Sequence, residues 1–203
     1  MRRASVFLVI SVLAGVGGST TAPLSPGQTN TLTTIDEVPS YEQLVTSLGS
    51  GSSGDAIATL IGAASGQSES AIGIRLRAIH SLVTICQAPN VCDSSSAAHA
   101  ALLDIVVDPT YTTATSGSNV LILRAAIESL GQLKQTGDAD SLLGFLDHPS
   151  RDVRATTAFA LRDLCNSQVA VPPLHTRLQH EATAQVQLAI SAALRALSQS
   201  PCI

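Results

Sequence analysis

One pattern recurs four times along this chain and limits the folds that it can adopt. In each copy an aliphatic residue is followed eight positions later by leucine, within a stretch that contains alanine and arginine. The copies run from Ile74 to Leu82, Ile122 to Leu130, Val153 to Leu161 and Val186 to Leu194. Their leucines lie 48, 31 and 33 residues apart. Periods of about 20–50 residues are typical of repeat proteins, in which each unit buries its apolar face by stacking on the next. The sequence therefore predicts a stack of helical repeats.

The core of such a stack has to be aliphatic. The 203 residues include no Trp, two Tyr and three Phe, and this length is sufficient for one domain. Helices rich in Ala and Leu pack closely without large rings, which favours stacked helical pairs over a β-sandwich or barrel. Charge is sparse and acidic, with a formal net charge of −4 and Lys134 as the only lysine. We therefore expect no nucleic-acid partner, because a phosphate-binding stripe needs clustered cations.

The first 22 residues are typical of a secretory signal peptide. Arg2 and Arg3 precede an apolar run over residues 6–16, and small residues follow up to position 22. The run is much shorter than the about 20 apolar residues of a membrane anchor, so we expect no membrane span after the signal is removed. The mature chain is expected in the periplasm or outside the cell, with its formal net charge lowered from −4 to −6 by the loss of both arginines.

An even number of cysteines in an exported chain predicts disulfide bonds. The four are Cys86, Cys92, Cys165 and Cys202. A zinc site is the alternative, but it needs close pairs such as C-x₂-C, and the only close pair here has five residues between its members. Cys86 and Cys92 bracket a turn and can meet locally. Cys165 and Cys202 each follow the leucine of a repeat, and stacking of the last two units predicts a bond between them. We expect no metal.

Breaker residues divide the chain into segments. Residues 23–40 are rich in Thr, Pro and Ser and are predicted to be a disordered or extended lead-in, and residues 41–203 the repeat domain. Within the domain a short helix over 41–48 and a flexible joint over 49–54 come first. Eight helices are then predicted, forming four antiparallel pairs: 55–65, 69–86, 95–107, 118–135, 138–147, 151–166, 171–181 and 183–198. Ser150 is predicted to cap the helix that follows it, and Pro172-Pro173 to mark a helix end.

The third unit carries a recognisable run of residues. A short first helix ends in Leu146-Asp147, a turn contains Pro149, and Asp152-Val153-Arg154 opens the second helix. This run resembles HEAT-type repeats, including the shorter variety of phycobilin-lyase-like bacterial proteins, and the resemblance extends over roughly residues 55–198. It implies an all-α fold, an α-α superhelix of about four helical pairs, and usually protein binding, although some members have enzymatic roles in attaching bilins. At the position of Arg154 the other units have Arg75, Leu123 and Gln187.

The repeat frame also predicts which side chains of the second helices are exposed. In the third unit the stripe from Val153 to Leu161 is predicted to be core and the opposite stripe to face solvent. Transfer of this frame to the other units gives three exposed ladders: Leu76, Arg124, Ala155 and Leu188; His80, Glu128, Phe159 and Ala192; and Val83, Gly131, Arg162 and Arg195.

A surface that mixes charged and apolar side chains is the kind of place where a protein partner binds. The candidate binding residues are Arg124, Glu128, Phe159, Arg162 and Arg195. The alternative is that they are ordinary solvated side chains, with Phe159 covered by a neighbour.

The second helix of the first unit, over 69–86, is apolar on nearly every face and is therefore expected to be buried. We expect either the helix over 41–48 or the inserted segment 108–118 to cover it. A cover supplied by the helix over 41–48 makes these residues part of the fold.

Nothing in the sequence predicts an active site. There is no H-E-x-x-H or G-x-S-x-G motif, and His175 and His180 are five residues apart, which is not the spacing of ligands on one helix face. The expected function is that of an exported, non-catalytic module that binds an unknown protein on its concave helical surface as a monomer, without a cofactor. Two alternatives stay open: an accessory protein or enzyme related to bilin lyases, and an envelope component that self-associates end to end.

Export gives the first testable prediction. Mass spectrometry of the native mature protein should show an N-terminus between about residues 17 and 25, because small residues end the apolar run there. An intact Met1 in the fractionated protein would contradict export.

Overall fold

The computed structural model describes residues 22–33, 38–68, 71–93 and 96–199, and this part of the chain is all-helical, without a strand. Its helices are α1 (Pro26–Thr33), α2 (Tyr41–Leu48), α3 (Ser53–Ser65), α4 (Ile72–Cys86), α5 (Ala97–Val107), α6 (Pro109–Thr112), α7 (Gly117–Leu133), η1 (Thr136–Asp138), α8 (Ala139–Leu142), η2 (Leu143–Asp147), α9 (Arg151–Leu164), α10 (Ser167–His180) and α11 (Ala184–Gln199), where η marks a 3₁₀-helix. Among these ranges there is no helix with the length and apolar character needed to cross a membrane.

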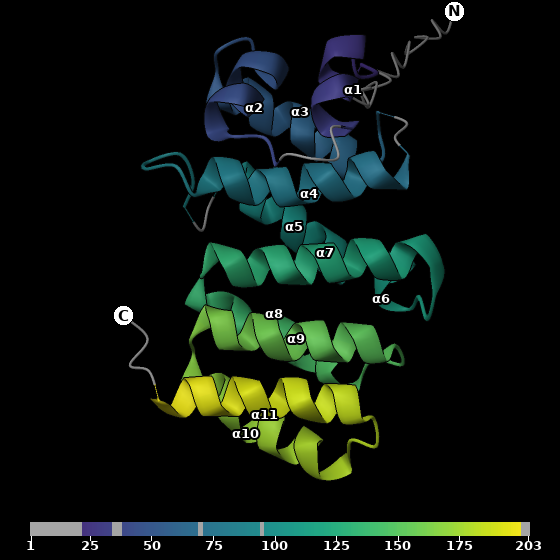
Figure 1. The fold of residues 1–203 in the computed structure, drawn as a ribbon, viewed down its shortest axis with the longest axis vertical. Coiled ribbons are helices and arrows are strands. Elements are labelled where there is room, and N and C mark those ends of the chain that lie inside the picture. Colours follow the sequence, from purple (N-terminus) through teal and green to yellow (C-terminus); the bar gives the residue numbers. More distant parts are fainter. Residues whose placement is uncertain (1–21, 34–37, 69–70, 94–95, 200–203) are drawn as a thin grey trace, which may run out of the picture.

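The helices pack as pairs that follow one another along the long axis of the molecule (Figure 1). α3 packs on α4, α5 on α7, η2 on α9, and α10 on α11. The second helices of the pairs, α4, α7, α9 and α11, lie side by side, and each packs on the next. These are the packing partners predicted from the repeat pattern. The all-helical class is confirmed, whereas the HEAT-like superhelix stays a prediction.

The repeated aliphatic residues form the core between neighbouring second helices. Six of the eight residues that define the pattern are fully buried: Leu82, Ile122, Leu130, Val153, Leu161 and Val186. The two that keep partial exposure are Ile74 and Leu194, and both belong to a terminal unit. Complete burial of an aliphatic side chain contributes about 1.5–3 kcal/mol, so stacking of the units supplies much of the stability of this fold.

α7 and α9 approach each other closely because a glycine lies at their contact. A Cβ atom added to Gly131 would lie 2.8 Å from the Cα of Ala160, and nothing larger than hydrogen fits there. This corrects one part of the exposed ladders, in which Gly131 was expected to face solvent. Val83 and Ala155 are also buried, since adjacent second helices close over these positions.

The first unit is covered as expected. In α4 the side chain of Ile79 is fully buried, and α1, α2 and α3 all pack on this helix. Leu44 and Leu48 of α2 are buried, so residues 41–48 are part of the fold. Segment 108–118 does not supply the main cover; it contains α6, which packs on α5 and α7 instead.

The lead-in prediction is wrong for residues 26–33. This segment forms α1, whose Leu32 is buried and which packs on both α2 and α4. The segment is mostly polar, so its one buried apolar residue, Leu32, produces no helical pattern in the sequence. The predicted joint over 49–54 is also structured. Residues 49–52 form a turn, in which the N–H groups of Gly49 and Gly51 both donate to the carbonyl of Val45 (3.1 and 3.0 Å), and α3 begins at Ser53.

Several predicted helix features differ in the structure, including the helix over 138–147, which is divided into η1, α8 and η2. Pro172 and Pro173 lie inside α10, although each removes one backbone N–H donor from the helix. Ser150 occupies the N-cap position of α9, but its side chain makes no capping bond. Its backbone N–H donates instead to Nδ1 of His148 (3.0 Å), a buried histidine whose pKa is lowered by that burial.

Residues 1–21 and 200–203 lie outside the described residues. The predicted signal peptide falls almost entirely in the first of these ranges, and Cys202 falls in the second. Cleavage of the signal and a Cys165–Cys202 bond therefore stay predictions.

The contact at Gly131 provides a test of the stacking. Replacement of Gly131 by alanine is expected to lower the free energy of unfolding by about 1–3 kcal/mol, because the new methyl group forces α7 and α9 apart. Urea unfolding followed by circular dichroism measures this change.

Gly73 of α4 offers a matched control. A Cβ atom at this position meets nothing within 4 Å, so Gly73→Ala should stabilise the protein by about 0.5–1 kcal/mol through helix propensity alone. Equal effects of the two substitutions would show that α7 and α9 do not pack as closely as described.

Candidate functional site

A groove of about 480 Å³ lies across α7, α9 and the start of α11. Its lining consists of Arg124, Glu128, Gln132, Asp152, Ala155, Thr156, Phe159, Ala160, Arg162, Asp163 and Gln185. A smaller hollow of about 280 Å³ shares Glu128 and Gln132 with it and continues onto α4, where His80 lines it. The row of second helices thus presents one hollowed surface that extends from α4 to α11, which we call the row face.

Phe159 is the aromatic centre of the groove. Its side chain is 39% exposed, an unusual state for one of only three phenylalanines in the chain. The guanidinium of Arg162 lies 5.0 Å from the ring centroid, within the range of a cation–π contact. Arg162 also donates from Nε and Nη2 to the carboxylate of Asp163 (2.7 and 3.0 Å), and these hydrogen bonds raise its pKa.

Polar side chains connect neighbouring helices along the row face. Nε of Arg124 on α7 is 3.4 Å from the hydroxyl of Thr156 on α9 and donates to it. Glu128 accepts a hydrogen bond from Gln132 (3.3 Å) and lies 3.9 Å from Nε2 of His80 on α4. His80 and Glu128 are each six residues beyond the first aliphatic residue of their repeat copy. Their contact therefore supports the frame in which the ladders were predicted.

The structure brings four of the five candidate binding residues together and leaves one apart. Arg124, Glu128, Phe159 and Arg162 line the same groove. Arg195 lies on α11 outside it, where its side chain is exposed and its Nε donates to the carbonyl of Ser191 (3.3 Å).

Exposed leucines extend the row face beyond the groove. Leu188 is 70% exposed and lies one helical turn from Gln185, which lines the groove. Leu121 is 42% exposed and lies one turn before Arg124 on α7. Both leucines belong to second helices, α7 and α11, and neither lines the groove itself.

A buried ion pair fixes α9 against the last unit. Arg154 donates from Nε and Nη2 to both carboxylate oxygens of Glu181 (2.8 and 3.0 Å), and from Nη1 to the carbonyls of His148 and Pro149. Arg177 binds the same carboxylate at 2.7 Å. The hydrogen bonds from Arg154 hold the pKa of Glu181 well below its ordinary value.

The position of Arg154 has the same role in other units. In the first unit Arg75 donates to the carbonyl of Ala64 (3.0 Å) and to the hydroxyl of Tyr111 in the next unit (2.7 Å). In the fourth unit Gln187 donates to the carbonyl of Glu181 (2.6 Å). Three of the four units therefore use a long polar side chain here to bind the preceding turn. The sequence showed the two arginines but not their acceptors, which lie outside the repeat pattern.

His99 and Asp138 form a buried pair that sequence reasoning missed. Nε2 of His99 on α5 lies 3.0 and 2.8 Å from the two carboxylate oxygens of Asp138 in η1. Both residues are about 5–6% exposed, so the contact joins the second unit to the third inside the protein. The two are 39 residues apart in sequence, and neither belongs to a motif that could have indicated the pairing.

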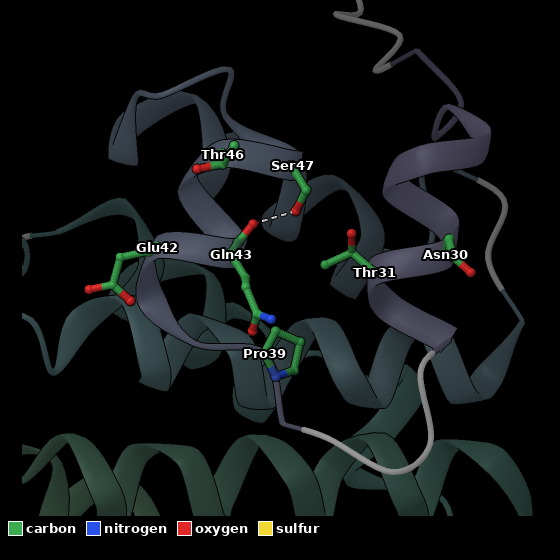
Figure 2. A pocket seen from close by; sticks show the side chains of 7 residues that line it. All are labelled: Asn30, Thr31, Pro39, Glu42, Gln43, Thr46 and Ser47. Atoms are coloured by element: carbon green, nitrogen blue, oxygen red, sulfur yellow. Dashed lines mark hydrogen bonds between the residues drawn. The ribbon is translucent and has the colours of Figure 1, made fainter.

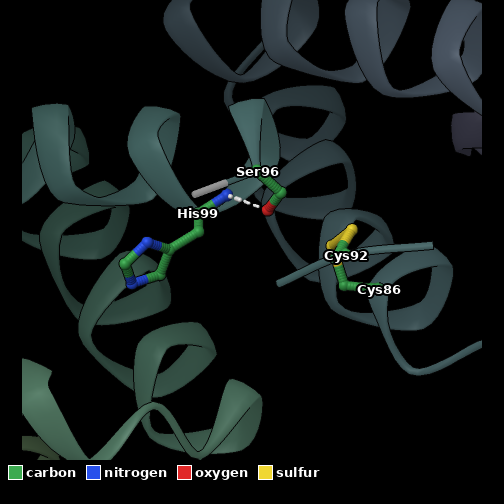
Figure 3. The surroundings of a disulfide bond; sticks show 4 residues. All are labelled: Cys86, Cys92, Ser96 and His99. Atoms are coloured by element: carbon green, nitrogen blue, oxygen red, sulfur yellow. Dashed lines mark hydrogen bonds between the residues drawn. A yellow bond between two sulfur atoms is a disulfide. The ribbon is translucent and has the colours of Figure 1, made fainter. Parts of the chain in front are cut away.

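The disulfide between Cys86 and Cys92 is confirmed. It closes the turn after α4, and Figure 3 shows it together with Ser96 and His99 at the start of α5. There the hydroxyl of Ser96 accepts a hydrogen bond from the backbone N–H of His99 (3.3 Å) and caps the helix. The Cys86–Cys92 disulfide therefore lies at the end of the first unit, away from the groove.

A second hollow, of about 460 Å³, lies between α1 and α2 (Figure 2). Its lining side chains already have local partners: the hydroxyl of Ser47 donates to the carbonyl of Gln43, and the amide oxygen of Gln43 accepts from the N–H of Ser40 (2.7 Å). Gln43 thus belongs to the capping box of α2, and the hydroxyl of Ser47 bonds within the helix, so neither group is directed at a ligand. We therefore place the candidate site on the row face.

Among the described residues no group of three or more His, Cys, Asp or Glu side chains could bind a metal ion. Comparison of the chain with protein-family models, with curated proteins and with solved structures finds no match. The features of this protein that bear on its function are therefore the groove, the exposed ring of Phe159 and the arginines that line the groove.

The buried carboxylate of Glu181 leads to a prediction about pH. Its pKa is ordinary in the unfolded chain and lowered in the folded protein, so its contribution to stability is present above about pH 4.5 and is lost as the pH falls further. Glu181→Gln should cost about 3–5 kcal/mol at pH 7. Below pH 4.5 the difference from the wild type should shrink by about 1.4 kcal/mol per pH unit.

Urea unfolding at pH 7, 4 and 3 measures this difference. Asp104→Asn, at an exposed position in α5, is the control and should show a much weaker pH dependence. A difference between Glu181→Gln and the wild type that does not change with pH would mean that Glu181 is not ion-paired.

Proposed function

We propose that this protein is an exported, non-catalytic interaction module, built as a HEAT-like superhelix, that binds a partner protein on its row face. The resemblance of the third unit to HEAT repeats supports the superhelix, and so does the regular stacking of four helical pairs. In such an architecture the second helices line one continuous surface that is suited to an extended partner.

The observation that carries the proposal is the partly exposed Phe159 in a groove that two arginines also line. Aromatic and arginine side chains are the residues that most often dominate protein interfaces, because each combines a large contact area with directed polar contacts. Here Phe159, Arg124 and Arg162 come from two adjacent helices and line one groove.

Export is part of the proposal. The Cys86–Cys92 bond supports it, because disulfides persist mainly in oxidising compartments. The secretory character of the first 22 residues points the same way.

Site-specific photo-cross-linking in the native host tests the proposed function. A photoreactive phenylalanine analogue at position 159 should give one dominant adduct with another protein, identified by mass spectrometry. The same analogue at Val107, which is 67% exposed on α5 and therefore away from the groove, is the control and should give none.

Equal adducts at both positions, or no adduct at position 159, would exclude the row face as an interface. An adduct composed of two copies of this chain would instead favour end-to-end self-association, and sedimentation of the purified mature protein would then show oligomers.

A further inference from the structure

Charge is distributed unevenly between the second helices and the rest of the molecule. The four second helices carry seven arginines and three carboxylates: Arg75, Arg77, Arg124, Arg151, Arg154, Arg162 and Arg195, against Glu128, Asp152 and Asp163. Elsewhere in the described part of the chain nine carboxylates accompany two cations, Lys134 and Arg177. A protein of acidic net charge thus concentrates its arginines on the helices that form the row face.

The carboxylates of the row face are already paired within it. Asp163 binds Arg162 at 2.7 Å, and Asp152 lies 3.7 Å from Arg151. Glu128 has His80 and Gln132 against it.

Two arginines of this face have no such partner. Among the described residues Arg124 contacts a hydroxyl and Arg195 a backbone carbonyl, and no carboxylate lies within ion-pair distance of either. Each guanidinium keeps further N–H donors available to a ligand, because only its Nε is engaged in these bonds.

Arg124, Phe159 and Arg195 follow a diagonal across three neighbouring helices. They lie two, six and nine residues after the first aliphatic residue of their repeat copies on α7, α9 and α11. With a rise of about 1.5 Å per residue and helix axes about 9 Å apart, each step of the diagonal is about 10–11 Å. A chain that connects both arginines and passes over the ring therefore spans about 21 Å, or six to seven extended residues at about 3.3 Å each.

Apolar surface lies between the two arginines. Phe159 is on the diagonal, and Leu188 of α11 extends the same surface. A ligand that satisfies the whole arrangement has carboxylates near both ends and a large apolar side chain between them.

We infer that the partner presents an extended acidic segment of about seven residues, whose terminal carboxylates bind Arg124 and Arg195 and whose central apolar side chain packs on Phe159. This inference rests on the proposed function and specifies the chemistry of its ligand. Charge complementarity of this kind guides association and selects against basic partners, since like charges placed opposite each other repel.

Fluorescence anisotropy with the purified, oxidised mature chain tests the inference. The probe is a labelled eight-residue peptide with two glutamates at each end and one leucine among central serines. It should bind saturably, and an increase from 50 to 500 mM NaCl should weaken binding about tenfold, because salt screens exposed charges. Replacement of the leucine by serine, or of the glutamates by lysines, should weaken binding by about tenfold or more.

Protein variants locate the binding on the diagonal. Arg124→Gln and Arg195→Gln should each weaken binding about five- to tenfold, whereas Lys134→Gln removes the same charge at the C-terminal end of α7, off the diagonal, and should have no effect. The double variant Arg124→Glu, Arg195→Glu should reverse the preference and bind the lysine peptide. This gain of binding cannot result from misfolding.

Three outcomes would overturn the inference: no saturable binding of the acidic peptide, equal binding of the acidic and basic peptides, or equal effects of Lys134→Gln and Arg124→Gln. If a cross-link from position 159 still identifies a partner in that case, the row face remains an interface and only the acidic ligand is excluded. If both experiments fail, the proposed function fails with the inference.

Discussion

No second helix of this protein can bury its apolar stripe without its neighbours, and the rest of the structure depends on this constraint. α7 is buried between α4 and α9, and α9 between α7 and α11. The contact between Gly131 and Ala160 shows how small residues let two helices approach until their aliphatic side chains interlock. The row face is the side of these helices that stacking leaves uncovered, so its regular spacing of side chains is a direct result of the core.

Stacking alone does not fix how far one unit is rotated or shifted on the next. Polar contacts between units supply that information. Arg154 reaches Glu181, Arg75 reaches Tyr111, and His99 reaches Asp138, and each contact crosses a boundary between units. Because breaking a buried hydrogen-bonded pair costs far more than sliding apolar surfaces past each other, such contacts select one register. The alignment of the groove across α7 and α9 follows from this selection.

Much of the fold could be predicted from the sequence because the aliphatic residues carry two spacings. The spacing within each copy indicates a helix, and the spacing between copies indicates that the helices stack as repeats. The burial of the apolar helix over 69–86 was predicted from its apolar faces, and the Cys86–Cys92 bond from the short turn between the two cysteines. The sequence could not show α1, since one buried leucine among polar residues produces no periodic signal. It also could not show that Ala155 and Gly131 are buried, because a small residue is compatible with either environment. For the candidate site, the repeat frame predicted which arginines share one face. It could not predict that Arg162 forms an ion pair with Asp163 while Arg124 forms none, because this depends on side-chain geometry.

The disulfide at the end of α4 has a consequence for the order of assembly. Its two cysteines are six residues apart, so the bond can close before any later part of the chain has folded. Three of the helices that pack on α4, namely α1, α2 and α3, also precede it in sequence, so one side of α4 can be covered before α7 is present. The other side of α4 stays open for α7, so during synthesis the first unit can provide an apolar surface onto which each later pair is added in turn.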